Sequence, residues 1–555
     1  MKRTTLAIAG VGLLLVGMVA GQWMHTPPSP DDTEAFRTLR SAYEIVRNSY
    51  VDPIPPDSLA TASMRGMMDT LDPFSVYLSP ERMKQVEESF RGSFEGIGIS
   101  YELIEGPDGR DTIGVTTVLP GGPSAKAGLR AGDRIVEVAG TSAVGWSHQK
   151  IQRRLKGPAG SSVSVTLRRP SRSDRLERSI TRGTVPLETV DAAYMIDDRT
   201  GYLRLNRFAR TTHREVAHAL ASMKEEGLSR LILDLRGNAG GLMSMAEKVA
   251  DEFLVEGQLI VRAGSRHEEY GGARYATGEG LLEQAPLAVL VDEHSASASE
   301  IVAGALQDHD RAVIVGRRTF GKGLVQRQYD LDDGSALRLT VARFYTPSGR
   351  LLQRPHGEER DTLHARSPAS VPDSLVHRTD AGRRVVGGGG IPPDRVVADS
   401  MLNPYRRAVT REGLVRTFAR RWADAHSARL RDRWTDRPDA FADRFSVPST
   451  VYPAFVRYAE EHGVRAPALR ATVGAEEAPG RPPAPPTDGA FDRSAVEAAR
   501  ADIETDLKAY VGQRLFGPAM LIRVRNTIDP VVRAAQQSWP RAERWAQRYP
   551  IRGGE

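Results

Sequence analysis

The sequence predicts an α/β multidomain protein with an N-terminal helical segment, a small partly open β-barrel, an α/β core around a buried sheet, and a mostly α-helical C-terminal extension. The chain has 555 residues, which is too many for one hydrophobic core. Short strands with glycine turns give way near residue 185 to alternating strands and helices. The strands of this later part are apolar throughout, which is typical of a sheet covered on both faces.

The composition restricts the classes of function. The 76 basic and 70 acidic residues give a net charge of +6, a small excess for this length, and no basic run carries interleaved aromatic residues. These features argue against a dedicated nucleic-acid-binding protein. The chain contains no cysteine, which excludes thiol catalysis, structural disulfides and thiolate metal sites.

Residues 1–24 have the pattern of an export signal. Lys2 and Arg3 precede an apolar stretch over residues 6–21. This stretch is somewhat short for a full membrane span, and Ala20-Gly21 could precede a cleavage site. The pattern predicts a signal peptide or a membrane anchor, with the rest of the chain outside the cytoplasm.

Residues 33–90 form the predicted helical segment. Its apolar positions recur with helical spacing, at Leu39, Tyr43, Ile45 and Val46. The pattern breaks at Asp72-Pro73 and restarts after Ser79, an expected N-cap that precedes a proline.

Residues 91–182 form the predicted barrel. The stretches "GIGISYEL", "DTIGVTTVL", "DRIVEVAG" and "SVSVTLRR" are typical of strands, and "PSAKAGLRAGD" and "HQKIQRRLKG" of helices. Several short strands with two helices favour a small, partly open barrel.

Residues 185–400 form the predicted α/β core. The apolar strands "RLILDLRGNAGG", "PLAVLVDEHSASASE" and "RAVIVG" alternate with helical stretches such as "LMSMAEKVADEFL" and "EIVAGALQD". Residues 401–555 are arginine-rich and mostly helical, with a Pro/Ala/Gly linker at residues 474–490.

The stretch "HSASASEIVAGALQDHDRAVIVGRRTFGKGLVQ" carries the chemistry. Its serines lie at a turn between a strand and a helix, where free N–H groups and the helix dipole can stabilise an oxyanion. The glycine turn of "DLRGNAGGL" can supply a further N–H. A serine nucleophile needs a base, and Lys322 can serve if burial keeps its amine neutral. If "KGLVQ" is a strand, Gln326 lies on the same face as Lys322 and can orient that amine.

The same residues can also be explained by purely structural roles, without any catalysis. Ser297-x-x-Glu300 is itself a capping box, and Lys322 could be a solvent-exposed turn residue. The chemistry alone does not favour a catalytic pair over these roles.

The same stretch resembles the core motif of the carboxy-terminal processing proteases, also called tail-specific proteases. "YVDPIPPDSLATASMRGMMDTLDPFSVYLSPE" resembles their N-terminal helical segment, and "FEGIGISYEL" and "PGGPSAKAGLRAGDRIVEVAG" resemble their PDZ domain. "LILDLRGNAGGL", "LTVARFYTPSGRLLQRP" and "GGGIPPD" resemble their protease core. The resemblance spans residues 33–400 in the expected order. It implies that residues 91–182 are a PDZ domain and residues 185–400 a serine protease core.

The family implies a serine endopeptidase with a Ser–Lys dyad that uses no metal or cofactor. By this resemblance Ser297 is the nucleophile, Lys322 the general base and Gln326 the assisting glutamine. The backbone N–H groups of Ala298 and Gly241 form the expected oxyanion hole.

Other residues near the expected nucleophile receive different roles. Gly240 is the alternative to Gly241 in the oxyanion hole. Ser295 and Ser299 are expected to be structural, as is His294, which belongs to the strand end.

The PDZ domain is expected to recognise substrate C-termini. The N–H groups of Gly96, Ile97, Gly98 and Ile99 can hold a terminal carboxylate, while the strand edge pairs with the peptide. The helix "HQKIQRRLKG" would form the other wall of the groove, with Arg91 as a further candidate contact.

These features together predict an exported endopeptidase, periplasmic or membrane-anchored and facing the periplasm or cell exterior, that cleaves exported proteins near or from their C-terminal tails. The expected partners are protein or peptide substrates with free apolar C-termini, the membrane if the N-terminal segment is uncleaved, and a second copy in a homo-oligomer; nucleic acid is not expected. The alternatives are a non-catalytic PDZ scaffold on a protease-like fold and a Ser–His hydrolase of small esters.

Overall fold

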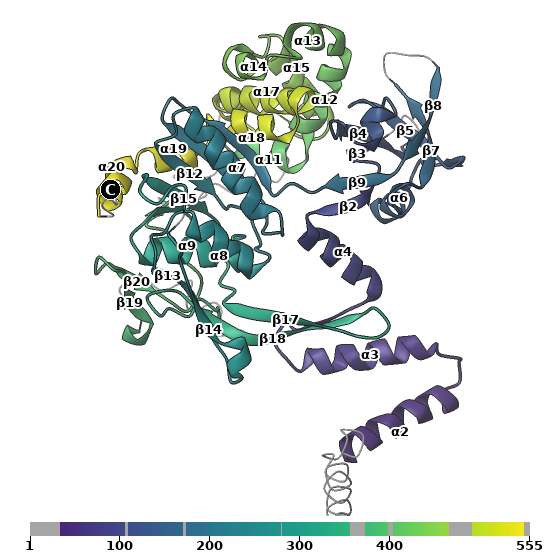
Figure 1. Cartoon of the computed structure of the whole chain (residues 1–555). Coiled ribbons are helices and arrows are strands. Elements are labelled where there is room, and N and C mark those ends of the chain that lie inside the picture. Colours follow the sequence, from purple (N-terminus) through teal and green to yellow (C-terminus); the bar gives the residue numbers. More distant parts are fainter. Residues whose placement is uncertain are drawn as a thin grey trace, which may run out of the picture. The chain divides into compact units, whose positions relative to one another are not determined.

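The structure is a computed structural model that describes residues 34–105, 109–169, 174–278, 280–355, 372–397, 403–465 and 491–548. Its two compact units comprise Met1–Pro80 with Arg327–Thr340, and Glu81–Gln326 with Val341–Glu555 (Figure 1). The expected export signal and the expected linker at residues 474–490 lie outside the described residues. Within the described ranges, no helix combines the length and apolarity that crossing a membrane requires.

Among the described residues before Pro80, the first unit includes helix α2 (Glu34–Ser49), helix α3 (Pro56–Asp69) and the short strand β1 (Val76–Leu78). The helical pattern breaks at Asp72-Pro73 as expected, because the Asp72 carboxylate accepts hydrogen bonds from the N–H groups of Phe74 and Ser75. The strand β1 that follows was not predicted, and it pairs antiparallel with the first residues of β18.

A two-stranded ribbon flanks the predicted barrel at both of its chain ends. Helix α4 (Pro80–Arg91) begins at the proline that the sequence indicated. After it, β2 (Ser93–Gly96) pairs antiparallel with β9 (Gly183–Pro186).

The barrel is a six-stranded antiparallel sheet in the order β3-β4-β5-β7-β8, with β6 paired to β5, so β3 lies at an edge. The hydrophobic core contains Ile113, Ile135 and Leu167 of the sheet and Ile151 of helix α6. The elements are β3 (Ile99–Glu105), β4 (Asp111–Val118), α5 (Pro123–Lys126), β5 (Arg134–Val138), β6 (Thr141–Ser142), α6 (His148–Leu155), β7 (Ser162–Arg168) and β8 (Arg175–Thr181).

The α/β core contains a six-stranded sheet in the order β10-β11-β12-β15-β16-β21. Only β10 is antiparallel to its neighbour among these pairings. Every residue of β15 and of β16 is buried, as their apolar sequences predict. The strands are β10 (Val190–Met195), β11 (Thr200–Leu205), β12 (Arg230–Asp234), β15 (Leu287–Val291), β16 (Val313–Gly316) and β21 (Arg395–Val396).

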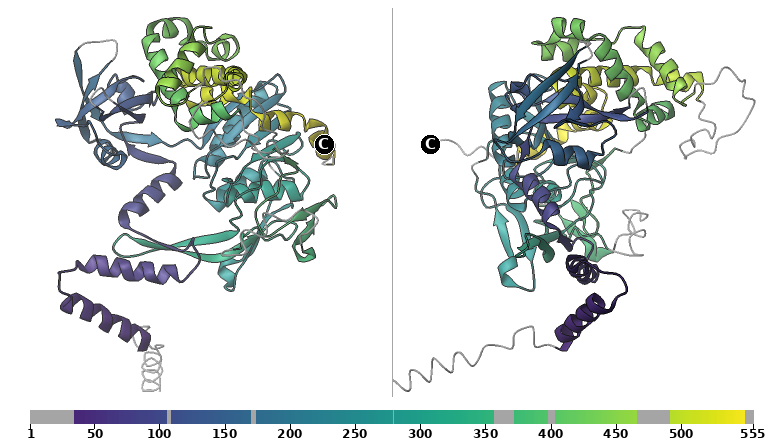
Figure 2. Two further views of the ribbon diagram at one scale, coloured as in Figure 1. Left: turned by 180° about the vertical axis from the view of Figure 1, so that it is seen from behind. Right: turned by 90° about the vertical axis from the view of Figure 1, so that its right-hand side faces the viewer.

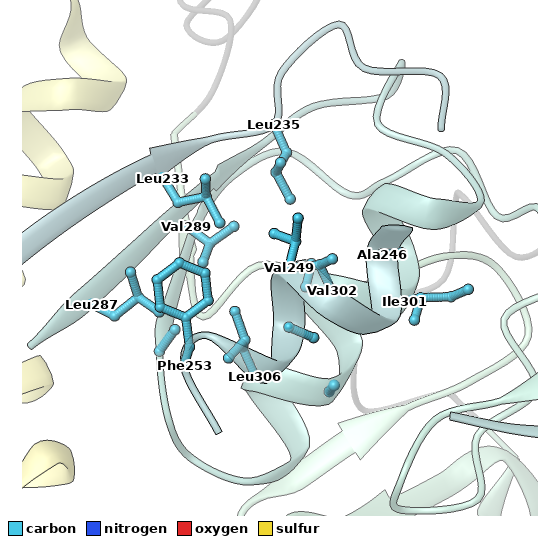
Figure 3. Packing of buried hydrophobic residues seen from close by; sticks show 14 of the residues in the cluster. Leu233, Leu235, Ala246, Val249, Phe253, Leu287, Val289, Ile301, Val302 and Leu306 are labelled. Atoms are coloured by element: carbon cyan, nitrogen blue, oxygen red, sulfur yellow. The ribbon is translucent and has the colours of Figure 1, made fainter. Parts of the chain in front are cut away.

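Each face of this sheet is covered by helices. Alternate strand residues point to opposite faces, so Leu233 and Val289 pack with Val249, Phe253 and Leu306 on one side (Figure 3). The helices on this side are α7 (Thr212–Glu225), α8 (Met243–Asp251) and α9 (Ala298–Asp308). The other face packs against the last two helices of the chain, α19 (Pro530–Gln536) and α20 (Trp539–Ala546).

A smaller sheet is formed by strands that alternate along the chain with those of the core sheet. Strand β18 pairs with β13 and with β17, and β13 pairs with β14. Short connecting elements complete this part of the chain. The elements are β13 (Leu259–Gly264), β14 (Gly272–Tyr275), β17 (Leu324–Asp330), β18 (Ala336–Tyr345), β19 (Val376–Arg378), β20 (Arg384–Val386) and the 3₁₀ turns Glu268–Tyr270 and Asp373–Leu375.

The C-terminal extension is helical, as predicted. Its helices before α19 lie side by side in Figure 1 and in both views of Figure 2, where they are green to yellow. They bury apolar cores of their own, with Phe455 and Leu507 in one and Phe441 and Met520 in another. The helices before α19 are α11 (Pro404–Arg411), α12 (Leu414–Ala425), α13 (Ser427–Trp434), α14 (Pro438–Arg444), α15 (Val451–Glu461), α16 (Arg493–Ala498), α17 (Arg500–Phe516) and α18 (Pro518–Asn526).

Candidate active site

Ser297 lies at the turn between strand β15 and helix α9. Its backbone has φ 54° and ψ −111°, a combination that residues other than glycine rarely adopt. Ser297 is half-buried, whereas all eleven residues of α9 behind it are buried. The sharp turn thus leaves one serine accessible at the N-terminus of a helix, where the helix dipole favours negative charge.

The buried Glu300 carboxylate joins the serine turn to the lysine loop. Its Oε2 atom accepts hydrogen bonds from the backbone N–H of Ser297 at 2.8 Å and of Lys322 at 2.9 Å. Its Oε1 atom accepts from the N–H of Gly321 at 2.8 Å and from the Thr319 hydroxyl at 2.6 Å. Burial raises the pKa of Glu300 above its ordinary value, although these hydrogen bonds act in the opposite direction.

The half-buried Lys322 contacts the glutamine that the sequence indicated. Its Nζ donates a hydrogen bond to Oε1 of Gln326 over 2.9 Å. Lys322 precedes β17 rather than lying within it, yet the two side chains meet as expected. The flanking glycines allow close packing, because a Cβ at Gly321 would lie 3.0 Å from the backbone nitrogen of Gly390, and one at Gly323 would lie 2.7 Å from that of Gln353.

The glycine turn after β12 lies against the serine turn. A Cβ on Gly240 would lie 2.9 Å from Cβ of Ser297 and 3.0 Å from the backbone nitrogen of Ala298, so no larger residue fits. The N–H of Gly240 donates to Oδ1 of Asn238 and is therefore occupied. Within the described part of the chain, the N–H groups of Gly241 and Ala298 donate no hydrogen bond, which leaves both available to a ligand.

Two serines beside Ser297 bind the backbone of the glycine turn. The Ser295 hydroxyl donates to the carbonyl oxygen of Leu235 and the Ser299 hydroxyl to that of Asn238, and both serines are fully buried. His294, by contrast, has a side chain 71% exposed that lies 3.8 Å from Glu293. The contacts of Ser295 and Ser299 agree with the structural roles expected for them. His294 does not belong to the strand end as expected, because β15 ends at Val291 and the histidine lies in the turn that follows.

The expected peptide-binding loop lies at the edge strand β3. Gly98 has φ +73°, which suits glycine at this turn, and Ile97 is buried in the core of the small sheet. Gly96 ends β2 and Ile99 begins β3, whose other edge pairs with β4. This arrangement leaves a strand edge beside a turn rich in N–H groups.

Helix α6 forms a wall beside this edge strand. The ring centroids of Tyr101 on β3 and His148 on α6 are 5.5 Å apart, and the Tyr101 hydroxyl donates to the His148 carbonyl oxygen. Burial raises the pKa of Tyr101. Arg91, a further candidate contact, instead pairs with Glu87 on its own helix over 2.8 Å.

Sequence reasoning missed three charged residues around the site. Glu300 was recognised only as part of a capping box, although its carboxylate also binds the loop of Lys322. Asp234 and Arg236 form an ion pair over 2.6 Å at the carboxyl end of β12, where charged residues after an apolar strand were the available signal. Among the described residues, no cluster of three or more histidine or acidic side chains could hold a metal ion.

Comparisons with known sequences agree with this arrangement. The profile of peptidase family S41 matches residues 199–362, and that of a PDZ domain matches residues 114–169. The profile of the activating protease CtpB N-terminal domain matches residues 21–82, and that of a family of unknown function matches residues 405–517.

Two curated relatives match more than half of the chain. A carboxy-terminal-processing protease of Bartonella bacilliformis is 34% identical over 357 residues, which is 63% of this chain and 80% of the relative. The carboxy-terminal processing protease CtpB of Bacillus subtilis is 32% identical over 355 residues, 62% of this chain and 72% of the relative. Among solved structures, the photosystem II D1 C-terminal processing protease is 30% identical, with a TM-score of 0.36, covering 66% of this chain and 88% of that one.

Proposed function

Since the chain belongs to the carboxy-terminal processing proteases of peptidase family S41, we propose that it is a serine endopeptidase with a Ser–Lys dyad that cleaves exported proteins near or from their C-terminal tails. The observation that carries the proposal is the single Glu300 carboxylate that binds the backbone of both Ser297 and Lys322. This shared contact supports the pairing of a nucleophile with a base, because it joins the backbones of two residues that lie 25 positions apart in the chain (322 − 297).

The proposed reaction proceeds through an acyl-enzyme. The neutral amine of Lys322 takes the proton of the Ser297 hydroxyl as its oxygen attacks the substrate carbonyl. The N–H groups of Ala298 and Gly241 stabilise the oxyanion, and Lys322 then passes the proton to the departing amine. Water, activated by the same amine, attacks the ester and releases the second product with regeneration of Ser297.

Gln326 supports this role of Lys322 without adding charge. A neutral amide oxygen 2.9 Å from Nζ orients the amine but gives no ionic stabilisation to its protonated form. The half-buried position of Lys322 also limits its access to water. Both features favour a base that is active near neutral pH.

Substrate recognition is assigned to the PDZ domain. The turn of residues 96–99 offers N–H groups for a C-terminal carboxylate, and the edge of β3 can pair with an extended apolar peptide. Tyr101 and His148 line the same edge from the strand and from α6.

We assign the protein to the exported compartment, periplasmic or anchored in the membrane and facing the periplasm or cell exterior. The basic residues and the apolar run at the start of the sequence support this assignment. A homo-oligomer is supported by the apolar side chains that α2 leaves exposed, Phe36, Leu39, Ile45 and Val46.

The test compares the wild-type protein with Ser297→Ala and Lys322→Ala. Unfolded model proteins with apolar or charged C-termini serve as substrates, and cleavage is followed by mass spectrometry. We expect wild type to cleave those with apolar ends, and each variant to lose on the order of 10⁴-fold or more in kcat/KM. Circular dichroism checks that both variants stay folded.

The outcomes separate the alternatives. Binding without cleavage by wild type would indicate a PDZ scaffold. Full activity of Lys322→Ala would refute the base assignment, and a histidine scan that abolished activity would instead indicate a Ser–His hydrolase.

A further inference from the structure

An ion-pair cluster links the C-terminal extension to the glycine turn of the candidate active site. The Arg236 guanidinium donates to Asp234 through Nε and Nη2, with a shortest distance of 2.6 Å. Its Nη1 donates to Oδ2 of Asp529 over 2.8 Å, across 293 positions of sequence. One arginine thus joins the core strand β12 to the start of helix α19.

The cluster is largely buried. The side chains of Asp234, Arg236 and Asp529 are 0%, 17% and 20% exposed. Burial opposes the charge on Arg236, but the Asp234 carboxylate outweighs it and holds the pKa of Arg236 well above its ordinary value. Charge-assisted hydrogen bonds in such surroundings are strong and orient the groups that they join.

Arg236 stands at the beginning of the turn that carries the expected oxyanion donor. The next residue, Gly237, donates its N–H to Asp292, and Gly241 follows four positions later. The turn is therefore fixed at one end by Arg236 and at the other by its contact with Phe208, whose carbonyl oxygen accepts from the N–H of Leu242.

Asp529, the partner of Arg236, is itself held in position by helix α19. Its Oδ1 atom accepts from the N–H groups of Val531 and Val532 and so caps α19. Those valines are buried against the second face of the core sheet. One carboxylate thus caps a helix with one oxygen and binds Arg236 with the other.

We propose that Asp529 is a positioning residue for the oxyanion hole: through Arg236, the C-terminal extension fixes the glycine turn so that the Gly241 N–H faces the nucleophile. This inference rests on the proposed function and adds to it a residue outside the segments that resemble the protease family. A contact made only through the oxyanion donors stabilises the transition state more than the bound substrate, so its loss lowers kcat and leaves KM nearly unchanged.

The sharpest variant is Asp529→Asn. The asparagine oxygen can still cap α19, because asparagine is as good an N-cap as aspartate, but the negative charge facing Arg236 is lost. The matched control is Asp492→Asn at the N-cap of α16, where the exposed aspartate accepts from the N–H of Ala495.

The test requires that the wild-type protein cleaves peptide and that Ser297→Ala does not. Under this condition we expect Asp529→Asn to lower kcat by about 10- to 100-fold. KM should change less than about twofold. Asp492→Asn should keep the wild-type kcat, and Asp529→Glu should recover part of the loss by restoring the charge. An unchanged kcat in Asp529→Asn, or an equal loss in Asp492→Asn, would overturn the inference.

Hydrogen exchange gives a second readout that does not depend on cleavage. Peptides that cover residues 235–242 should exchange several-fold faster in Asp529→Asn than in wild type and Asp492→Asn. Equal exchange in all three proteins would reject the positioning role even if no substrate were found, whereas failure of wild type to cleave would count against the proposed function alone.

Discussion

The strained backbone of Ser297 is held in place by its neighbours. A residue in a sparsely populated conformation costs on the order of 1–3 kcal/mol, so it persists only where the surroundings determine it. Here the Ser297 N–H binds Glu300, the Ala296 N–H binds the carbonyl oxygen of Asn238, and the Ser299 hydroxyl binds the same oxygen. The serine turn and the glycine turn therefore fix each other.

At the residue scale, Gln326→Glu tests how the charge of Lys322 is controlled. A carboxylate 2.9 Å from Nζ would favour the protonated amine and raise the pKa of Lys322. We expect the acid limb of the kcat/KM profile to move to higher pH by about one unit, with lower activity at pH 7.

The control for this prediction is Gln328→Glu. Gln328 lies further along β17, and its side chain donates to Asp330 instead. Its pH profile should match wild type. An unshifted profile in Gln326→Glu would count against Lys322 as the titrating base.

At the element scale, helix α9 has no solvent-exposed face. A Cβ at its Gly304 would lie 2.9 Å from Cγ2 of Thr346 and 3.1 Å from Cδ1 of Ile391. Close packing of α9 against the segments that contain Thr346 and Ile391 therefore requires a glycine at position 304.

Gly304→Ala should therefore destabilise the core by about 1–3 kcal/mol, because overpacking outweighs the gain in helix propensity. Gly66→Ala in α3 is the control, since a Cβ there meets nothing within 4 Å. It should leave stability unchanged or raise it by about 0.5–1 kcal/mol. Differential scanning calorimetry measures both, and equal melting temperatures for the two variants would contradict the packing argument.

Glu215 joins the start of α7 to the beginning of β10. Its carboxylate accepts from the N–H and hydroxyl of Thr189 and from the N–H of Val190. Burial acts to raise the pKa of Glu215, but the nearby Thr211 hydroxyl and the hydrogen bonds from Thr189 and Val190 outweigh it and lower that pKa. A carboxyl whose pKa is lower in the folded state stabilises the protein above its unfolded pKa of about 4.3 and loses this contribution as pH falls through the folded value.

Glu215→Gln should remove this pH-dependent contribution. We expect it to cost about 1 kcal/mol at pH 7 and to flatten part of the fall in melting temperature below about pH 4.5. Glu225→Gln, at the exposed far end of the same helix, should follow wild type at every pH. A Glu215→Gln curve parallel to wild type throughout would show that the carboxyl does not titrate differently on folding.

Helices and strands could be predicted from the sequence more completely than tertiary contacts between side chains. The continuous apolar runs of β15 and β16 and the proline at the start of α4 followed from local propensity and burial. The lysine and glutamine were found because their contact is only four positions apart. The second role of Glu300 and the Arg236–Asp529 pair depend on tertiary distances that no spacing encodes, and β1 is too short for a pattern.

At the scale of the whole molecule, the C-terminal extension is part of the core. Sheet residues such as Ile232, Leu290 and Val315 pack against Val532 and Trp539 of its last helices. The extension therefore combines a helical body of its own with the layer that closes the second face of the sheet.

Trp539→Ala tests the closing layer. Trp539 is 5% exposed, and the Arg230 guanidinium lies 5.0 Å from the centroid of its ring. Truncation should cost about 3–5 kcal/mol and increase binding of an apolar dye, because a buried face of the sheet becomes accessible. The control is Trp422→Ala, a half-buried residue stacked on His426. Equal dye binding and equal melting temperatures for Trp539→Ala and Trp422→Ala would show that α19 and α20 are not needed to cover the sheet.

The order in which the chain is made gives this closing layer a further consequence. The ribosome has finished the last strand of the core sheet at Val396, but the helices that seal its second face begin only at Pro530. A nascent chain that has not yet reached Pro530 therefore lacks the helices that cover the second face of this sheet. Ser297, Lys322 and the glycine turn all precede α19 in the chain, so the proposed site is synthesised before the helices that cover the second face of its sheet.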